Sequence, residues 1–446
     1  MTMVHTGARL DRLPVSPFHY RLLWLIGAGM FLDGFEVYLQ GGVLAALVGA
    51  GWSTPALNAN FISSTFAGML VGSWLAGVAG DRYGRRFAYQ FNLLVFGLAA
   101  LAGAAAPSMD WLIAIRFVMG VGLGAEIVVG YVTISEFVPP KSRGRWGSAL
   151  ALITCSALFV STLAGRVIIP NYGWRWMFVI VGIGALIVWF LRRRMPESPR
   201  WLESKGHLER AEAVMAEIER EVTASGKTLP PPVEVETPHV ASSLKTLFQG
   251  EMLMRTIIGC VLLIGMNTAL YGLIGFLPTF MVKQGISVVS SLNYATLMTA
   301  GAPVGALIGL WLSDFMGRKK CIVIFSLLAV VFGLMYPLSK DPSIVTLFGF
   351  LLVTCLYVLV AVIWALYLPE LFPTSIRMRG AGFCNTIGRL MTILTPQLIV
   401  PLFAGYGVMG VVAMVSSLLL LQAFMVGFFG IETKEKSLEA LVPVRP

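Results

Sequence analysis

The sequence predicts an all-α membrane protein whose twelve transmembrane helices form two related six-helix bundles. Three observations support this class. Hydrophobic residues make up 57% of the 446 residues and charged residues only 13%, about half the usual charged share of a globular chain. The apolar residues are collected in runs of about 20, the length that crosses a bilayer as a helix. Charged motifs of the first half also recur in the second half at a nearly constant separation.

Twelve apolar runs follow one another along the chain, and within lipid each must satisfy its backbone hydrogen bonds as a helix. The expected spans are approximately 22–46, 57–79, 87–106, 111–134, 147–168, 174–191, 254–278, 292–313, 320–339, 344–368, 380–403 and 407–429. The first run contains Asp33 and Glu36, and no small-residue cleavage site follows it. We therefore expect a retained span rather than a signal peptide.

The distribution of positive charge predicts the orientation of the spans. If the N-terminus is cytoplasmic, most of the 33 lysines and arginines fall in cytoplasmic loops. This positive-inside pattern predicts that both termini face the cytoplasm and that a lipid bilayer surrounds the chain. It also accounts for the net charge of +10, so binding to nucleic acid is a poor explanation of that charge.

Cysteine and histidine give no sign of a metal site or cofactor. The five cysteines, Cys155, Cys260, Cys321, Cys355 and Cys384, stand singly in apolar runs, without disulfide or zinc spacing. All four histidines lie outside the predicted spans. We expect no bound metal and no cofactor.

Two charged motifs indicate that the six-span unit is duplicated. The first pair places Asp81, Gly84 and Arg85 against Asp314, Gly317 and Arg318, and the second places Glu136 and Arg143 against Glu370 and Arg377. The step from 81 to 314 in the first pair and the step from 136 to 370 in the second differ by a single position. Two motifs at nearly one separation indicate an internal repeat. The predicted domains are an N-terminal bundle (1–191), a cytoplasmic helical linker (192–253), a C-terminal bundle (254–429) and a cytoplasmic tail (430–446).

The linker between the two halves shows helical periodicity from Glu203 to Val222. Its apolar residues fall on one face. These residues are Leu208, Ala211, Val214, Met215 and Ile218. We expect cytoplasmic helices that lie under the bundle, and the alternative is a partly flexible linker.

The chain also resembles a known family. The segments "GDRYGRR", "RFVMGVGLGAE", "PESPRWL" and "GIETKEKSLE" are similar to those of the major facilitator superfamily, on the side of its sugar porters and its organic-ion and aromatic-acid symporters. The resemblance implies two bundles around a central cavity that opens alternately to either face of the membrane. Together with the lack of an N-terminal targeting extension, it leads us to expect a monomeric transporter in a bacterial inner membrane.

The repeated motif has a physical interpretation within this family. An acid at the cytoplasmic end of one helix can cap a neighbouring helix and pair with an arginine. We expect a charge network that holds the cytoplasmic side closed in the outward-facing state. It consists of Asp81, Arg85, Glu136 and Arg143 in the first half, with Asp314, Arg318, Glu370 and Arg377 as the corresponding residues in the second. The alternative is that these charges only set the topology.

Ionisable residues inside the spans are the candidates for proton coupling, because each costs roughly 2.5–3.5 kcal/mol at mid-membrane. Asp33 and Glu36 lie three residues apart on one helix face. In relatives that the motif resembles, the second acid carries the proton and interacts with an arginine in span four, which implies a pair of Glu36 and Arg116. The alternatives are Asp33 as the proton carrier, or a static ion pair. Glu126 could be a second proton site, a substrate contact or a structural partner of an arginine.

Arg389 is the main candidate for binding an anionic substrate. Its surroundings, "NTIGRLMTILTP", resemble the region of organic-anion transporters where an arginine attracts the substrate, and a guanidinium suits bidentate binding of a carboxylate. The alternative is a structural pair with Glu126 or a helix end. Other polar and aromatic side chains of the C-terminal spans could complete the cavity, or could serve ordinary helix packing. They are Asn267, Tyr271, Trp364, Tyr367, Asn385 and Gln397.

These observations predict proton-coupled symport of a small organic anion, such as an aromatic or hydroxylated monocarboxylate of the nicotinate or benzoate type. One alternative is a transporter of a neutral sugar, a polyol or an organic cation, although span seven lacks the Gln-Gln pair of sugar porters. Another is a membrane sensor that does not transport. An enzyme is the least expected class, because no nucleophile–base or metal constellation is visible in the spans.

Overall fold

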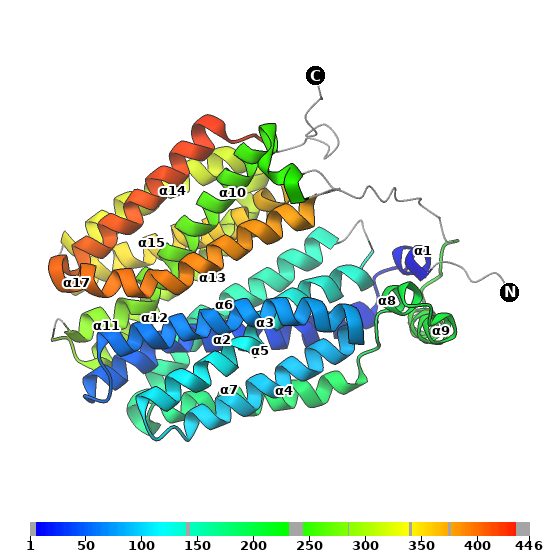
Figure 1. The fold of residues 1–446 in the computed structure, drawn as a ribbon, viewed down its shortest axis with the longest axis horizontal. Helices are drawn as coiled ribbons and strands as arrows, with labels where there is room; N and C mark the ends of the chain where they lie inside the picture. Colours follow the sequence, from blue (N-terminus) through cyan, green and yellow to red (C-terminus); the bar gives the residue numbers. More distant parts are fainter. Residues whose placement is uncertain are drawn as a thin grey trace. The chain divides into compact units, whose positions relative to one another are not determined.

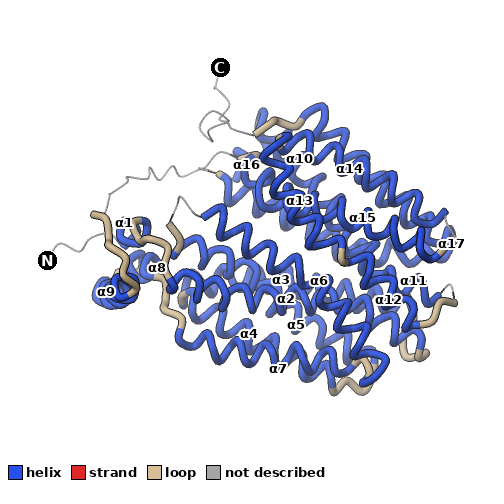
Figure 2. Tube along the Cα trace, turned by 180° about the vertical axis from the view of Figure 1, so that it is seen from behind, coloured by secondary structure: helices blue, strands red, loops and turns tan. Residues whose placement is uncertain are grey.

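The computed structural model describes residues 6–139, 143–231, 244–283, 285–338, 341–372 and 376–433. Within these residues the chain is mostly helical, with short loops between the helices and no β-strand, as Figure 2 shows. The predicted all-α class is confirmed. Figure 1 shows the course of the chain and the helix labels used below.

The helices of the first half are short at the N-terminus and long thereafter. They are α1 (Thr6–Asp11), α2 (Pro17–Gly49), α3 (Pro55–Tyr83), α4 (Arg85–Ala104), α5 (Met109–Phe137), α6 (Arg143–Tyr172) and α7 (Arg175–Leu191). The segment between the halves contains α8 (Pro199–Ser204) and α9 (Leu208–Ala224).

The second half is more interrupted. Its helices are α10 (Gly250–Asn267), α11 (Gly275–Lys283), α12 (Val288–Thr299), α13 (Gly301–Met316), α14 (Arg318–Met335), α15 (Pro342–Val362), α16 (Leu368–Glu370) and α17 (Arg377–Phe429). Two π-helical segments, Thr268–Ile274 and Ile363–Tyr367, join α10 to α11 and α15 to α16.

Eleven helical stretches of the described residues are long and apolar enough to cross a membrane. The longest of them, Arg379–Phe429, contains two spans, because α17 is interrupted at Gly407, whose φ of 63° is not helical. The predicted spans 380–403 and 407–429 lie on either side of this break. The twelve predicted spans therefore all correspond to helices.

The chain forms two compact units. Unit 1 contains residues 1–36, 67–154 and 178–238, and unit 2 contains residues 37–66, 155–177 and 239–446. The two ends of α2, α3 and α6 thus pack in different units, so the units cross the boundaries of the predicted domains. The domain limits drawn from the internal repeat stay a prediction.

Glycines allow close packing of corresponding helices in the two units. A Cβ atom on Gly68 or Gly72 of α3 would lie 2.2 or 1.9 Å from a backbone carbonyl oxygen of α5. A Cβ atom on Gly301 or Gly305 of α13 would lie 2.6 or 2.2 Å from a carbonyl oxygen of α15. These glycines form small-xxx-small motifs that bring helix backbones together in membranes. The step from 68 to 301 equals the step from 81 to 314, so the contacts extend the internal repeat beyond the charged motifs.

Helix α9 docks on unit 1 through the apolar face that the sequence predicts. Met215 and Ile218 of this face are buried in one apolar cluster with residues of α1, α2 and α5, as is Val222, while Val214 packs against the cluster and Ala211 is buried. The helix begins at Leu208 and not at Glu203, because Gly206, with a φ of 77°, follows the end of α8. Leu208, the first residue of the helix, belongs to the predicted apolar face and is 44% exposed.

Ion pairs fasten the N-terminal helix α1 region to α9. Arg9 contacts Glu212 at 2.5 Å and Glu219 at 2.6 Å, and Arg12 contacts Glu219 at 2.6 Å. Burial alone would raise the pKa of Glu219, but the hydrogen bonds from Arg9 and Arg12 bring this pKa below its usual value. We call these four residues the clasp. It joins the beginning of the chain to the segment between its two halves.

Candidate functional site

The predicted pair of Glu36 and Arg116 is formed within unit 1, between the middle of α2 and the first third of α5. Glu36 on α2 and Arg116 on α5 make an ion pair, and both side chains are 0% exposed. Arg116 also donates to the Met119 sulfur at 3.5 Å, and its guanidinium lies 6.0 Å from the Phe178 ring centroid. A buried carboxylate binds a proton more tightly when its cation withdraws. This arrangement can therefore switch between a proton-free and a proton-bound form.

Asp33 lies one helical turn before Glu36 on α2 and is 2% exposed. Its side chain is thus as deeply buried as the pair itself. The structure therefore places both acids of the predicted proton site in the interior of unit 1.

Glu126 forms a second buried ion pair, and its partner is a residue that the sequence did not single out. Arg192 follows the end of α7, and both Arg192 and Glu126 are 1% exposed. Arg192 also donates to the carbonyl oxygens of Leu25 at 2.9 Å and Ile26 at 3.0 Å on α2. This geometry corresponds to the third alternative for Glu126, a partner of an arginine. Arg192 is the first of three arginines, Arg192–Arg194, at the end of an apolar span. This position is the sequence feature that could have indicated Arg192 as a partner of Glu126.

Gly29 makes room for this second pair. A Cβ atom on Gly29 would lie 2.0 Å from Arg192 Nη2 and 2.3 Å from Glu126 Oε1. The pair thus sits directly against the backbone of α2, at a position where any side chain on this helix would displace it.

Two of the four residues predicted for the charge network of the first half, Arg85 and Glu136, contact each other near the turn between α3 and α4. Arg85 donates to Glu136 at 3.1 Å and to the Gly80 carbonyl at 2.8 Å. The backbone N–H groups of Arg85 and Arg86 donate to the Glu197 carboxylate at 2.9 and 3.1 Å. We call Gly84, Arg85, Glu136 and Glu197 the first corner.

Glu197 packs against a glycine turn and caps α4. Gly84 has a φ of 101°, and a Cβ atom on it would lie 2.2 Å from Glu197 Oε2. Burial raises the pKa of Glu197, although the backbone hydrogen bonds from Ser198, Arg86 and Arg85 oppose this rise. Arg200 then links the corner to α1, because it donates to the Glu136 carbonyl at 3.1 Å and to Asp11 at 2.6 Å.

The second half builds the same arrangement within unit 2. Arg318 pairs with Glu370 at 3.4 Å, and the N–H groups of Arg318 and Lys319 donate to Glu432 at 3.0 and 3.2 Å. Gly317 has a φ of 90°, and a Cβ atom on it would lie 2.5 Å from Glu432 Oε2. We call Gly317, Arg318, Glu370 and Glu432 the second corner.

Glu197 and Glu432 are a third repeated pair, which the sequence alone did not reveal. Their segments, "PES" and "IET", share little beyond the glutamate, and the step from 197 to 432 is slightly longer than that of either charged motif. Only the contacts relate the two residues. The side chains of Asp81, Arg143, Asp314 and Arg377 lie outside the part of the chain that the structure describes, so their predicted places in the network stay predictions.

The two π-helical segments of unit 2 carry three of the predicted cavity residues: Tyr271, Trp364 and Tyr367. A π-helical turn holds an extra residue and occurs often at functional sites. Tyr367 is 0% exposed, whereas Trp364 is half-buried. The sequence gives no signal for these irregular turns, because their composition is that of an ordinary apolar helix.

Arg389 lies close to an aromatic cluster of unit 2. It interacts electrostatically with the Tyr271 hydroxyl. The Tyr271 ring stacks on Tyr38 with centroids 6.4 Å apart and lies 4.5 Å from Phe66. The Tyr38 hydroxyl in turn lies 2.8 Å from the Tyr357 hydroxyl. The structure thus brings two predicted substrate residues, Arg389 and Tyr271, together with three aromatic residues that were not among the sequence candidates.

The three predicted amide residues differ in their environments. Asn267 is 4% exposed and lies next to Gly388 of α17, where a Cβ atom would be 2.9 Å from its Nδ2. Asn385 donates to the Ala381 carbonyl of its own helix at 2.9 Å. Gln397 is exposed and donates to Asn60 at 2.9 Å on α3. Asn267 is therefore buried against α17, whereas Asn385 bonds within its own helix and Gln397 bonds to a different helix, α3.

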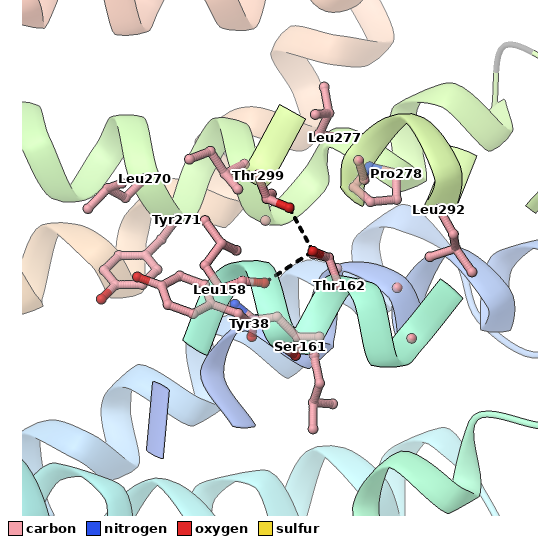
Figure 3. A pocket seen from close by; sticks show the side chains of 18 residues that line it. Tyr38, Leu158, Ser161, Thr162, Leu270, Tyr271, Leu277, Pro278, Leu292 and Thr299 are labelled. Carbon is pink, nitrogen blue, oxygen red and sulfur yellow. Dashed lines mark hydrogen bonds between the residues drawn. The ribbon is translucent and has the colours of Figure 1, made fainter. Parts of the chain in front are cut away.

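A small cavity lies beside the tyrosines (Figure 3). Its volume of about 20 Å³ is room for a water molecule and not for an organic acid. Tyr38 and Tyr271 border one end, and the hydroxyls of Thr162 and Thr299 meet at 2.6 Å along its wall. Residues 37–66 and 155–177 pack in unit 2 with its C-terminal helices. The space left among the residues that line this cavity is therefore small in this conformation.

Comparison with known proteins shows the family of the chain. The family model described as "Sugar (and other) transporter" matches residues 29–444. The chain belongs to this family. A metabolite transport protein of the Escherichia coli inner membrane, YdjE, is 38% identical over 98% of this chain and 98% of its own. The niacin transporter NiaP of Acinetobacter baylyi is 30% identical over 97% of this chain and 99% of its own.

Similar solved structures show the fold of the chain. The xylose transporter XylE of Escherichia coli, in a partially occluded inward-open conformation, has a TM-score of 0.75 at 18% identity, over 95% of this chain and 100% of its own. XylE belongs to the major facilitator superfamily. The predicted family and fold are therefore confirmed, and the family is one of membrane transporters.

Proposed function

We propose that the protein is a secondary transporter that carries a small organic anion together with a proton by alternating access. The observation that carries this proposal is the Glu36–Arg116 ion pair, whose two side chains are wholly buried within helices long and apolar enough to cross a membrane. Ionisable groups in such positions are costly and usually serve ion or substrate pathways. A proton can bind Glu36 when Arg116 moves away, and this exchange couples proton movement to conformational change.

The aromatic cluster around Arg389 supports an anionic, ring-containing substrate. A guanidinium attracts a carboxylate, and the neighbouring Tyr271, Tyr38 and Phe66 rings suit stacking on an aromatic body. The relative named as a niacin transporter, which covers nearly all of this chain, supports the same substrate class, because niacin is an aromatic monocarboxylate. We therefore propose nicotinate- or benzoate-like acids as substrates.

The two corners act as cytoplasmic gates in this proposal. In each corner, backbone N–H groups of the turn between two helices donate to a glutamate that lies after the last span of the same half, Glu197 or Glu432. The positive-inside pattern supports cytoplasmic termini, and the Escherichia coli relative supports an inner-membrane location. Opening the cytoplasmic side would require these contacts to rearrange.

The experiment is a binding and uptake assay on the purified chain in vesicles. Nicotinate or benzoate should bind, should be taken up, and should bring protons with it. Arg389→Ala should weaken binding about 10–100-fold, as expected for the loss of a charged hydrogen bond, whereas Arg389→Lys should retain part of it. Binding of these acids that is unchanged in Arg389→Ala would exclude the assigned substrate site.

A second candidate function is the transport of a neutral sugar or polyol. The description of the matching family, "Sugar (and other) transporter", favours it. The same assay with xylose and inositol in place of the acids separates the two candidates, because a neutral substrate has no need of the Arg389 charge.

A further inference from the structure

The face of α2 that carries the proton site continues toward its N-terminal end. Glu36, Asp33 and Gly29 are three and four residues apart, a spacing that places them on one side of a helix. Gly29 has no side chain, and the Glu126 carboxylate occupies the space beside it, with Oε1 2.3 Å from the position of a Cβ atom. Three carboxylates therefore follow one another along this face at intervals of one helical turn, about 4.5 and 6 Å in axial rise.

All three carboxylates are buried in unit 1. Glu36 is 0% exposed, Asp33 2% and Glu126 1%. Two guanidiniums lie at the ends of the row, Arg116 beside Glu36 and Arg192 beside Glu126. With all three acids ionised, the row would have a net negative charge inside the hydrocarbon region, which is unfavourable. The row therefore favours the retention of one proton.

Unpaired carboxylate oxygens point to the same conclusion. Glu36 Oε2 and Glu126 Oε2 are buried, and neither accepts a hydrogen bond from the described residues. A buried oxygen without a donor is costly, and protonation of the carboxyl group removes most of this cost. These two oxygens lie at opposite ends of the row, so a proton has a binding position at each end.

Among the described side chains, one further titratable group faces the Glu126 end. Tyr89 on α4 lies beside the pair, with the Arg192 guanidinium 5.7 Å from its ring centroid, and it interacts electrostatically with both Glu126 and Glu197. The charged and titratable groups facing Glu126 are thus Arg192, Tyr89 and the row itself. Glu197 of the first corner comes next, outside the membrane-spanning segments.

We propose that Glu36, Asp33 and Glu126 form a proton-conducting row, in which Glu126, held by Arg192, is the exchange site at the end facing the predicted cytoplasmic side. A proton bound by Glu36 passes to Asp33 and then to Glu126, and each carboxylate returns to its ionised form as the proton leaves. Glycine at position 29 is required because it lets Glu126 reach the face of α2. This inference rests on the proposed function, and it extends that function by assigning the route of the proton.

The test compares Glu126→Gln with Glu126→Asp, and with Glu221→Gln as the matched acid-to-amide control. Glu221 lies in α9 of the same unit and pairs with Arg21 at the surface. In vesicles reconstituted with the full chain, nicotinate-driven proton uptake should fall by about tenfold or more in Glu126→Gln. It should be partly retained in Glu126→Asp. Exchange of labelled nicotinate across the vesicle membrane, which needs no net proton movement, should persist in all three variants.

Glu126→Gln leaves Arg192 buried without its anion and could fail to fold. The double variant Glu126→Gln/Arg192→Gln removes both charges and should therefore fold. Proton uptake equal to that of the unaltered protein in either variant would overturn the row. A folded variant that loses both nicotinate exchange and proton uptake would also overturn it, because that result marks Glu126 as a substrate contact. Absence of proton uptake in the unaltered protein would instead reject the proposed function.

A spectroscopic measurement tests the row without any substrate. Infrared difference spectra between acidic and alkaline buffer should contain the carbonyl band of a protonated carboxylic acid, and this band should diminish in Glu126→Gln and in the double variant. Identical bands in the unaltered protein and in both variants would mean that Glu126 takes up no proton, and the proposed row would then be wrong.

Discussion

The corners are repeated in both halves of the chain, whereas the buried charged residues are not. The first and second corners share a glycine with positive φ, an arginine that pairs with a glutamate, and a second glutamate that caps the following helix. The buried charges of unit 1 have no such counterparts. At the offset that relates position 81 to position 314, the residues corresponding to Glu36, Arg116 and Glu126 are Ala269, Gly349 and Leu359.

This difference separates structural framework from chemistry. The features present in both halves, a tight turn, a helix cap and close helix contacts, belong to the architecture that the two halves share. A charge that is present in only one half is not required by the repeat, and it is expensive to bury. The unrepeated charges are therefore the better guide to function, and the variants below test this separation.

The largest effect is expected for the unrepeated pair. Arg116→Gln leaves the Glu36 carboxylate buried without its cation and should destabilise the protein by about 3–5 kcal/mol. Glu36→Gln/Arg116→Gln should recover most of this loss and remain unable to couple protons to transport. Thermal unfolding of both variants measures the stabilities, and a double variant as unstable as the single one would contradict this account of the pair.

A smaller and symmetrical effect is expected at the corners. Alanine at Gly84 or Gly317 would adopt a backbone conformation nearly restricted to glycine, at a cost of about 1–3 kcal/mol, and its Cβ atom would collide with Glu197 or Glu432. Both variants should lower the melting temperature by similar amounts. Gly382→Ala is the control, because a Cβ atom there meets nothing within 4 Å. A loss confined to one corner would show that the two are not equivalent.

The capping glutamates should contribute less than the glycine turns. Glu197→Gln and Glu432→Gln each alter the hydrogen bonds at a helix N-terminus and should cost about 0.5–2 kcal/mol. Burial raises the pKa of Glu197, so its carboxyl group favours the folded state most in acid. Its advantage over glutamine should shrink as the pH rises from about 4.3, the ordinary value for glutamate, through the raised pKa. Thermal unfolding at a series of pH values checks this, and an advantage that grows with pH would be inconsistent with it.

The smallest effect is expected in the clasp, for which the second half has no described equivalent. The pKa of Glu219 is lowered in the fold, so its stabilising contribution is present above about pH 4.3 and is lost as the pH falls through the lowered value. Hydrogen exchange of α9 should therefore accelerate in strong acid and, at neutral pH, in Glu219→Gln. Glu209→Gln, an exposed position of the same helix, should leave the exchange rate unchanged. Equal rates in both variants would remove the clasp from the account of α9 docking.

Particular residues show how far the sequence could predict the structure. Glu36 and Arg116 could be paired in advance because isolated charges in apolar runs are conspicuous and the family motif relates them. Arg192 could not, since it begins a run of three arginines at a span boundary, where a solvated charge is the usual outcome. The π-helical turns and the contacts between Glu197 and backbone N–H groups depend on local geometry that residue types do not encode. The division of α2 between the two units depends on packing alone.

The clasp has a consequence for the order in which the protein is made. Arg9 and Arg12 leave the ribosome about 200 residues before Glu212 and Glu219, an interval of roughly 10–40 s at ordinary rates of translation. During that interval the two arginines have no acidic partner from the clasp and can serve as the positive flank that orients the first span during insertion. If the N-terminus is cytoplasmic, as proposed, the same side chains would first help to orient the nascent chain and would later fasten its N-terminal segment to α9.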